Sequence, residues 1–221
     1  MRRPLRVKHD FRRPVYRTFA EFSRGYLPHR DPPGAFQFVT LKLSDAGVPR
    51  SARRPHGFFS PEETVDPSAE GRDARRFFAE YEAELHAGRG ACLLANPACA
   101  AIIVDVLDRF ASKDYRLLAW VVMPNHVHAL IALTSRRRLS AVVRRWKKSS
   151  AIAINRLLRR RGRVWLPEYF DRVIESPDAC LGVRDYIELN PVQAGIATTA
   201  LDWPYSSIHT RVAGAEGAPE A

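Results

Sequence analysis

The stretch "RLLAWVVMPNHVHALIAL", residues 116–133, decides the fold of this chain. It holds two runs rich in β-forming residues, 116–122 and 126–133, which are separated only by Met-Pro-Asn. Because Pro and Asn favour tight turns, the sequence predicts two antiparallel strands joined as a hairpin. The second strand carries His126 and His128 within an apolar run, where an imidazole is a poor fit unless it has a partner.

The segments on both sides of the hairpin show further strand and helix patterns. Asn96 before Pro97, and Ser176 before Pro177, have the residue types of a helix cap and a first helical position. The second of these helices should end before Pro191. In chain order we expect a strand at 36–43, helices at 74–86 and 97–112, the hairpin, a helix at 139–160, a strand at 170–174 and a helix at 177–190. This order predicts an α+β fold with helices packed on one face of an antiparallel sheet.

The chain divides into one domain and two terminal segments. Residues 1–34 are rich in Arg and Pro without a sustained period, which predicts a basic, loosely ordered arm. The Ala/Gly/Glu-rich end, 209–221, is expected to be a disordered tail. The domain is expected at 35–208, and its residues 44–64 are interrupted by prolines and predict irregular structure.

Composition narrows the class of protein. The 221 residues include 46% hydrophobic ones, enough for a packed core, yet no run approaches the roughly 20 apolar residues that span a bilayer. The N-terminus has no apolar secretory signal, so we expect a soluble cytoplasmic protein without a membrane partner. Three cysteines without a C-x-x-C pair predict reduced thiols rather than a disulfide framework or a zinc ribbon.

The charge distribution favours a polyanionic partner. The formal net charge is +11, and no Asp or Glu occurs between Ala129 and Pro167. Such a block can be a solvated helix face or a contact with an anionic membrane surface, but we favour nucleic acid as the partner. The basic residues predicted to contact DNA phosphates from the helix at 139–160 are Arg144, Arg145, Lys147, Lys148 and Arg156.

The two histidines have the spacing of a metal-binding pair. On a strand, residues i and i+2 point to the same face, so the imidazoles of His126 and His128 should lie side by side, about 7 Å apart at Cα. Two histidines leave a divalent ion with open positions, and a third protein ligand is needed. The alternative is that both are ordinary core or surface histidines, which is the commoner outcome for an isolated H-x-H.

The last predicted helix supplies candidate partners. Tyr186 and Asn190 are four residues apart and so share one helix face. A tyrosine placed there can act as a nucleophile, and an amide oxygen can complete a metal site. The alternative is that Tyr186 is half-buried in packing and that Asn190 only ends the helix. Asp185 and Glu188 flank the tyrosine but point away from it on a helix, so no general base is identified.

Four motifs together resemble a known family. They are "VVMPNHVHALI" at 121–131, "RGRVWLPEYFDRVI" at 161–174, "VRDYIELNPVQAGI" at 183–196 and "DWPYSS" at 202–207. In this order they resemble the REP-associated tyrosine transposases, relatives of the single-tyrosine HUH transposases of small bacterial insertion sequences. The resemblance runs from about Phe36 to Ser207, and it marks 35–208 as a catalytic domain in which residues 44–90 fit only loosely.

The resemblance implies a fold, a reaction and a site. The fold would be a ferredoxin-like or RRM-like antiparallel sheet. The HUH motif would be His126-Val127-His128, the nucleophile Tyr186 and the additional metal ligand Asn190, with Mg²⁺ or Mn²⁺ bound. The implied activity is cleavage and rejoining of single-stranded DNA through a 5′-phosphotyrosine, on hairpins of repeated extragenic palindromes.

Two other functions remain open at this point. A non-cleaving protein of RRM-like fold could bind palindromic hairpins without cutting them. A metal-dependent hydrolase could use His126 and His128 with water as the nucleophile, which would leave Tyr186 without a role. The sequence does not decide between a monomer and a homodimer.

Overall fold

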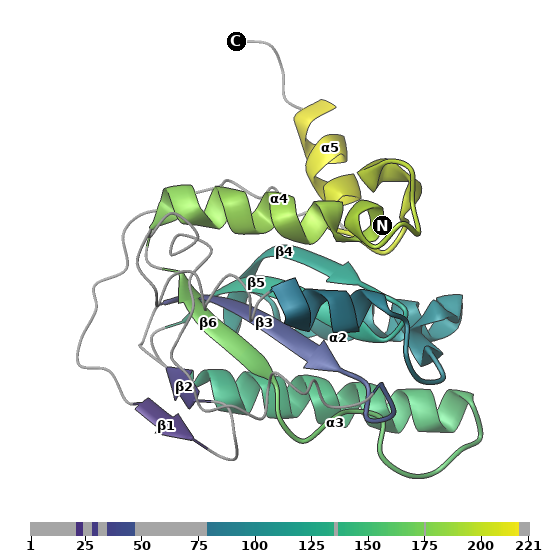
Figure 1. Cartoon of the computed structure of the whole chain (residues 1–221). Coiled ribbons are helices and arrows are strands. Elements are labelled where there is room, and N and C mark those ends of the chain that lie inside the picture. The colour runs from purple at the N-terminus through teal and green to yellow at the C-terminus, as the bar shows by residue number, and fades with distance from the viewer. Residues whose placement is uncertain are drawn as a thin grey trace.

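A four-stranded antiparallel sheet forms the centre of the protein (Figure 1). The computed structural model describes residues 21–23, 28–30, 35–46, 79–134, 137–174 and 176–216. Within these ranges the strands of the sheet lie in the order β4-β5-β3-β6. Their bounds are β3 Phe36–Lys42, β4 Tyr115–Val122, β5 His126–Leu133 and β6 Phe170–Ile174. The predicted hairpin is β4 and β5, and it is confirmed.

Two helical crossovers connect the strands. The short 3₁₀ turn η3 Leu93–Ala95 and helix α2 Pro97–Phe110 lie between β3 and β4, and α3 Leu139–Leu157 lies between β5 and β6. Two βαβ units whose strands interleave in this order make a ferredoxin-like sheet. The expected α+β class with an antiparallel sheet is therefore confirmed.

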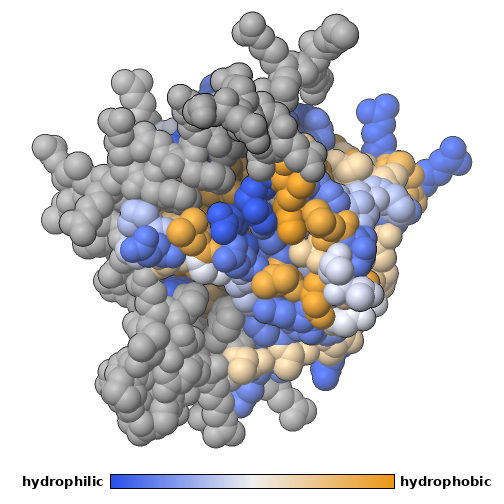
Figure 2. All heavy atoms as spheres, turned by 90° about the horizontal axis from the view of Figure 1, so that it is seen from above, coloured by the Kyte–Doolittle hydropathy of each residue, from blue (hydrophilic) through white to orange (hydrophobic). Residues whose placement is uncertain are grey.

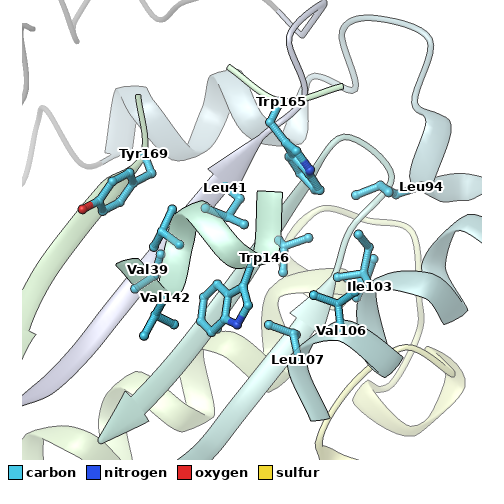
Figure 3. Packing of buried hydrophobic residues seen from close by; sticks show 14 of the residues in the cluster. Val39, Leu41, Leu94, Ile103, Val106, Leu107, Val142, Trp146, Trp165 and Tyr169 are labelled. Carbon is cyan, nitrogen blue, oxygen red and sulfur yellow. The ribbon is translucent and has the colours of Figure 1, made fainter. Parts of the chain in front are cut away.

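Helices cover both faces of the sheet, whereas the sequence predicted helices on one face. Helices α2 and α3 pack on the face that carries Val127 and Ala129 of β5. Figure 3 shows labelled side chains of α2, α3 and β3 packed together in this layer. Helix α4 Pro177–Gln193 packs on the opposite face, which carries Leu130 and Ala132. The physical reason is that all eight residues of β5 are buried, so each face of this strand needs its own cover.

Two tryptophans anchor α3 to the rest of the first layer. Trp146 is fully buried and donates from Nε1 to the Tyr115 hydroxyl at 2.8 Å. Trp165, on the segment after α3, donates from Nε1 to Ser150 Oγ at 2.9 Å. Both indoles are core residues, so neither offers the surface for stacking DNA bases that a tryptophan near a basic helix would suggest.

The C-terminal segment covers the outer edge of β4. After α4 come the 3₁₀ turn η4 Ala200–Asp202 and helix α5 Ile208–Glu216. Between them the Trp203 indole donates to Val122 O at 2.9 Å, and Ser207 N donates to Trp120 O at 2.9 Å. An exposed strand edge can pair with another chain through its free main-chain groups. Here the C-terminal segment forms hydrogen bonds with these groups of β4.

Two predicted boundaries are wrong. Helix α4 continues through Pro191 to Gln193, because a proline in the last turn removes one hydrogen bond without stopping the chain from coiling. The tail predicted as disordered from 209 is helical to Glu216, and Arg211 of this helix pairs with buried Glu188 of α4 at 2.7 Å. Residues 217–221 lie outside the described part.

The predicted N-terminal arm contains a short hairpin. Strands β1 Glu21–Ser23 and β2 Pro28–Arg30 pair antiparallel, and the rest of 1–34 lies outside the described residues, as do 47–78. Of the helix predicted at 74–86, residues 79–86 are described and are helical. The three cysteines are free thiols, and none of the described helices is long and apolar enough to cross a bilayer.

The outer side of the α4 layer is mixed in polarity. Figure 2 looks onto this side and shows hydrophobic residues interspersed with hydrophilic ones. The large exposed apolar side chains of α4 and of the chain that follows it are Leu181, Leu189, Ile196 and Leu201.

Candidate active site

The two histidines of β5 lie on the face of the sheet that α4 covers. His126 is paired in register with Lys42 of β3, and His128 with Thr40. Both imidazoles are fully buried, and their ring centroids are 4.7 Å apart. The prediction that the rings share one face of the strand is therefore confirmed.

Asn125 sets the tautomer of His126. The Asn125 carboxamide donates from Nδ2 to Leu85 O at 3.0 Å, which leaves its Oδ1 facing His126 Nδ1 at 2.6 Å. Because a carboxamide oxygen only accepts, Nδ1 of His126 must carry the proton. The lone pair of His126 is then on Nε2, the nitrogen that faces away from Asn125 and is free to bind a metal.

His128 is held by its neighbours on β3. Its Nδ1 lies 2.8 Å from Thr40 Oγ1, and its ring stacks on Phe38 with centroids 5.3 Å apart. The remaining nitrogen, Nε2, has no hydrogen-bond partner although it is buried. The site therefore presents two histidine Nε2 atoms, one from each imidazole.

Helix α4 brings Tyr186 and Asn190 against these histidines. The Asn190 carboxamide donates from Nδ2 to the Tyr186 hydroxyl at 3.2 Å, so the two side chains share one helix face as predicted. The Tyr186 ring centroid lies 5.7 Å from that of His128 and 6.0 Å from that of Phe38. The four residues predicted to form the site, from β5 and α4, are thus together in one place.

Two further residues of the site were missed by sequence reasoning. The helix at 79–86, "AEYEAELH", places Glu82 and His86 on one face, four residues apart. Glu82 Oε2 lies 3.5 Å from His86 Nε2, 3.9 Å from His128 Nε2 and 3.5 Å from Asn190 Nδ2. The signal in the sequence was the E-x-x-x-H pair itself, but this helix belongs to a segment that the family motifs do not cover.

Burial decides the protonation states of the site. It lowers the pKa of His126 to about 3 and that of His128 well below the ordinary value, so both imidazoles are neutral at pH 7. Burial raises the pKa of Glu82 to about 7, against the opposing effect of hydrogen bonds from Tyr186 and Asn190. The pKa of Tyr186 lies well above 10, first through burial and then through the neighbouring charge of Glu82.

The donor atoms fit a divalent metal ion. Nε2 of His126, Nε2 of His128 and Oδ1 of Asn190 are all buried without a hydrogen-bond partner. In the described part of the chain no three His, Cys, Asp or Glu side chains form a metal site by themselves. The set therefore depends on the amide oxygen of Asn190, and it offers the nitrogen and oxygen donors that divalent metal ions bind in proteins.

The predicted DNA-binding residues of α3 fall into two groups. Arg144, Lys148 and Arg156 are exposed and remain candidates for phosphate contacts. Arg145 is exposed too, but its guanidinium pairs with buried Asp114 at 2.5 Å. Helix α3 packs on the face of the sheet opposite the histidines, so none of these residues lines the site.

Lys147 has a structural role, in contrast to the prediction that it contacts DNA. Its ammonium donates to the main-chain oxygens of Leu166, Pro167 and Glu168 at 2.9, 3.0 and 2.9 Å. It also lies 5.3 Å from the centre of the Tyr169 ring. Burial lowers the pKa of Lys147 to about 8. All three donors of the ammonium are used within the protein, so none is left for a phosphate.

Replacing Lys147 by Met should therefore destabilise the protein. We expect a loss of about 2–4 kcal/mol in the free energy of unfolding, because three carbonyl oxygens lose a charged donor. Urea denaturation of Lys147→Met measures it, with exposed Lys148→Met as the matched control. A Lys147→Met protein of unchanged stability but weakened DNA binding would contradict the structural role.

Comparison with known proteins finds similarity to transposases. A family model described as "Transposase IS200 like" matches residues 97–190. The REP-associated tyrosine transposase of Escherichia coli (strain K12) is 29% identical over 102 residues, which are 46% of this chain and 59% of that relative. The aligned part thus spans about three fifths of the curated relative.

Solved structures show a similar fold. A REP-associated tyrosine transposase bound to a REP hairpin matches with a TM-score of 0.50 at 22% identity, over 88% of this chain and 86% of that one. A transposase from Deinococcus radiodurans, itself described as putative, matches with a TM-score of 0.34 at 16% identity, over 77% of this chain and 98% of that one. At these identities the first match supports the fold alone.

Proposed function

Because residues 97–190 match a family model described as "Transposase IS200 like", we propose that this protein is a metal-dependent strand transferase that cleaves and rejoins single-stranded DNA. One observation carries the proposal. The Tyr186 hydroxyl lies against Asn190, whose oxygen is buried without a partner, as is Nε2 of each site histidine. A nucleophile beside an open set of metal donors is what a phosphotyrosine mechanism needs.

The proposed reaction begins with attack of the Tyr186 oxygen on the scissile phosphorus. The new bond is a 5′-phosphotyrosine, the bond to the 3′ oxygen breaks, and the product strand ends in a free 3′-OH. The energy of the phosphodiester is retained in the covalent intermediate, so the step can be reversed onto another strand end. This reversibility distinguishes a strand transferase from a hydrolase.

The chain's residues have separate roles in this proposal. His126, His128 and Asn190 would hold the Mg²⁺ or Mn²⁺. A bound ion supplies Lewis-acid polarisation of the phosphate and stabilises charge on the 3′ oxygen. Asn125 and Thr40 orient the imidazoles, and burial keeps both of them neutral and so able to bind a cation.

The proposed substrate is a palindromic DNA hairpin. A structural relative is described as bound to a REP hairpin, and this chain carries a net charge of +11 with a basic α3. The exposed Arg144, Lys148 and Arg156 would neutralise backbone phosphates and contribute affinity without reading sequence.

Replacing Tyr186 by Phe tests the reaction. Single-stranded hairpin DNA is incubated with the protein and Mn²⁺ and run on a denaturing gel. The wild type should give a covalent protein–DNA adduct, which Tyr186→Phe should abolish because the variant lacks the nucleophilic oxygen. Half-buried Tyr205→Phe is the matched control and should retain the adduct. Cleavage that persists in Tyr186→Phe would indicate a hydrolase, and binding without any cleavage a non-catalytic hairpin-binding protein.

Replacing Asn125 by Ala tests the metal site without DNA. Loss of the carboxamide frees the His126 ring to rotate and to change tautomer, so we expect Mn²⁺ affinity to fall about 10–100-fold. Isothermal titration of the DNA-free protein measures it, and a thermal melt checks that the variant folds. Asn155→Ala, whose carboxamide donates to Gly162 O far along α3, is the control. Unchanged Mn²⁺ affinity in Asn125→Ala would contradict the proposed ligand role of His126.

The triple variant Arg144→Ala, Lys148→Ala and Arg156→Ala tests the basic surface of α3. Each phosphate contact contributes about −0.9 to the slope of log K against log salt concentration for duplex DNA. If all three residues contact the hairpin stem, the slope should become less negative by about 2–3 in fluorescence anisotropy titrations. An unchanged slope would remove α3 from the DNA-binding surface.

A further inference from the structure

Glu82 is a buried carboxylate that neither the family motifs nor the matched residues 97–190 include. Its side chain is only 10% exposed and lies among the site residues. A carboxylate out of water is costly unless it accepts hydrogen bonds or pairs with a cation. No Lys or Arg pairs with it among the described residues, so its hydrogen-bond donors decide its function.

The donors that reach Glu82 come from α4. The Asn190 Nδ2 lies 3.5 Å from Glu82 Oε2, and Glu82 and Tyr186 are close enough for each to shift the pKa of the other. The same Nδ2 donates to the Tyr186 hydroxyl at 3.2 Å. In its ionised form Glu82 only accepts hydrogen bonds, so a hydrogen bond between Glu82 and Tyr186 is then donated by the hydroxyl. The three side chains form a closed triangle.

This triangle also fixes which end of the Asn190 amide faces the histidines. Both contacts use Nδ2, so Oδ1 is turned away from Glu82 and Tyr186. That oxygen has no hydrogen-bond partner, and Asn190 favours the protonated forms of both His126 and His86. When Glu82 is ionised and accepts from the amide nitrogen, the amide oxygen is left on the side of the site histidines.

A role for Glu82 as a metal ligand fits the structure less well. Its Oε2 is 3.9 Å from His128 Nε2, yet Glu82, His86, His126 and His128 do not make a group of three that could hold a metal. The hydrogen bonds of the carboxylate run to the nucleophile and to Asn190 instead.

We propose that Glu82 is a further catalytic residue of this site, whose carboxylate accepts the hydrogen bonds of the Tyr186 hydroxyl and the Asn190 amide and so orients the nucleophile and the third metal donor together. The catalytic role of Glu82 rests on the proposed strand transfer. The contact between Glu82 and Tyr186 is independent of that proposed function. A nucleophile displaced by about 1 Å can lose roughly 100-fold in rate, so orientation alone gives a large effect.

Adduct formation tests the catalytic part of the proposal. Glu82→Ala should slow single-turnover formation of the Tyr186–DNA adduct about 100-fold, at saturating DNA and Mn²⁺. Hairpin affinity should stay within about threefold, because Glu82 is buried away from the basic surface of α3. Glu82→Gln should recover part of the rate, since its amide oxygen still accepts one hydrogen bond. Exposed Glu80→Ala on the same helix should match the wild type.

Three results would overturn the proposal. They are a Glu82→Ala rate within about threefold of the wild type, an equal loss of hairpin affinity and rate, and a Glu82→Gln rate no better than that of Glu82→Ala. A fourth is a fall of more than about 100-fold in Mn²⁺ affinity for Glu82→Gln by isothermal titration, which would make the carboxylate a metal ligand.

A spectroscopic measurement tests the contact without DNA or metal. With 3-fluorotyrosine incorporated, the ¹⁹F resonance of residue 186 is assigned by its absence in Tyr186→Phe. It should shift in Glu82→Ala and stay in place in Glu80→Ala, and an unmoved resonance would overturn the proposal. If the wild type forms no DNA adduct, the proposed strand transfer is contradicted. The ¹⁹F resonance still tests separately whether Glu82 contacts Tyr186.

Discussion

The burial of β5 on both faces is the constraint on which the rest of the structure depends. Its odd-numbered residues are apolar and are covered by α2 and α3, as in any ferredoxin-like sheet. Its even-numbered face begins with His126 and His128, and burying two imidazoles requires partners for four ring nitrogens. Asn125 and Thr40 satisfy the two Nδ1 atoms, and both Nε2 atoms remain open. The layer formed by α4 and the helix at 79–86 closes around these two atoms.

Local pattern predicts much of this arrangement, because the relevant signals lie within a few residues of each other. Strand alternation and turn chemistry place the hairpin, and i to i+4 spacing places Tyr186 beside Asn190. Helices are needed on both faces because β5 has no polar face. The sequence already indicates this, since the run from Ala129 to Leu133 is apolar without interruption. The prediction placed helices on one face of the sheet only, and so the second helical layer was missed.

Contacts between residues far apart in the chain could not be predicted from the sequence. Glu82 meets Asn190 across 108 positions, and nothing near either residue indicates the other. Lys147 is a residue for which the local pattern predicted the wrong contact. Its place in a basic block suggested that it contacts a phosphate. In the fold, residues 166–168 pack against Lys147, and their carbonyl oxygens accept all three hydrogen bonds of its ammonium. A charge run indicates a partner only for those members whose donors the fold leaves free.

The sheet separates the basic surface of α3 from the candidate site under α4. The exposed basic residues of α3 lie on one side, where solvent and salt weaken each contact and phosphates can slide. The histidines and Glu82 lie buried on the other side, with Tyr186 partly buried beside them, where hydrogen bonds are stronger and geometry is fixed. In the proposed function, affinity for DNA and the chemistry at Tyr186 can therefore change independently. On this proposal, a substitution of an exposed basic residue on α3 changes DNA affinity, and one in the layer of α4 changes the rate of the reaction.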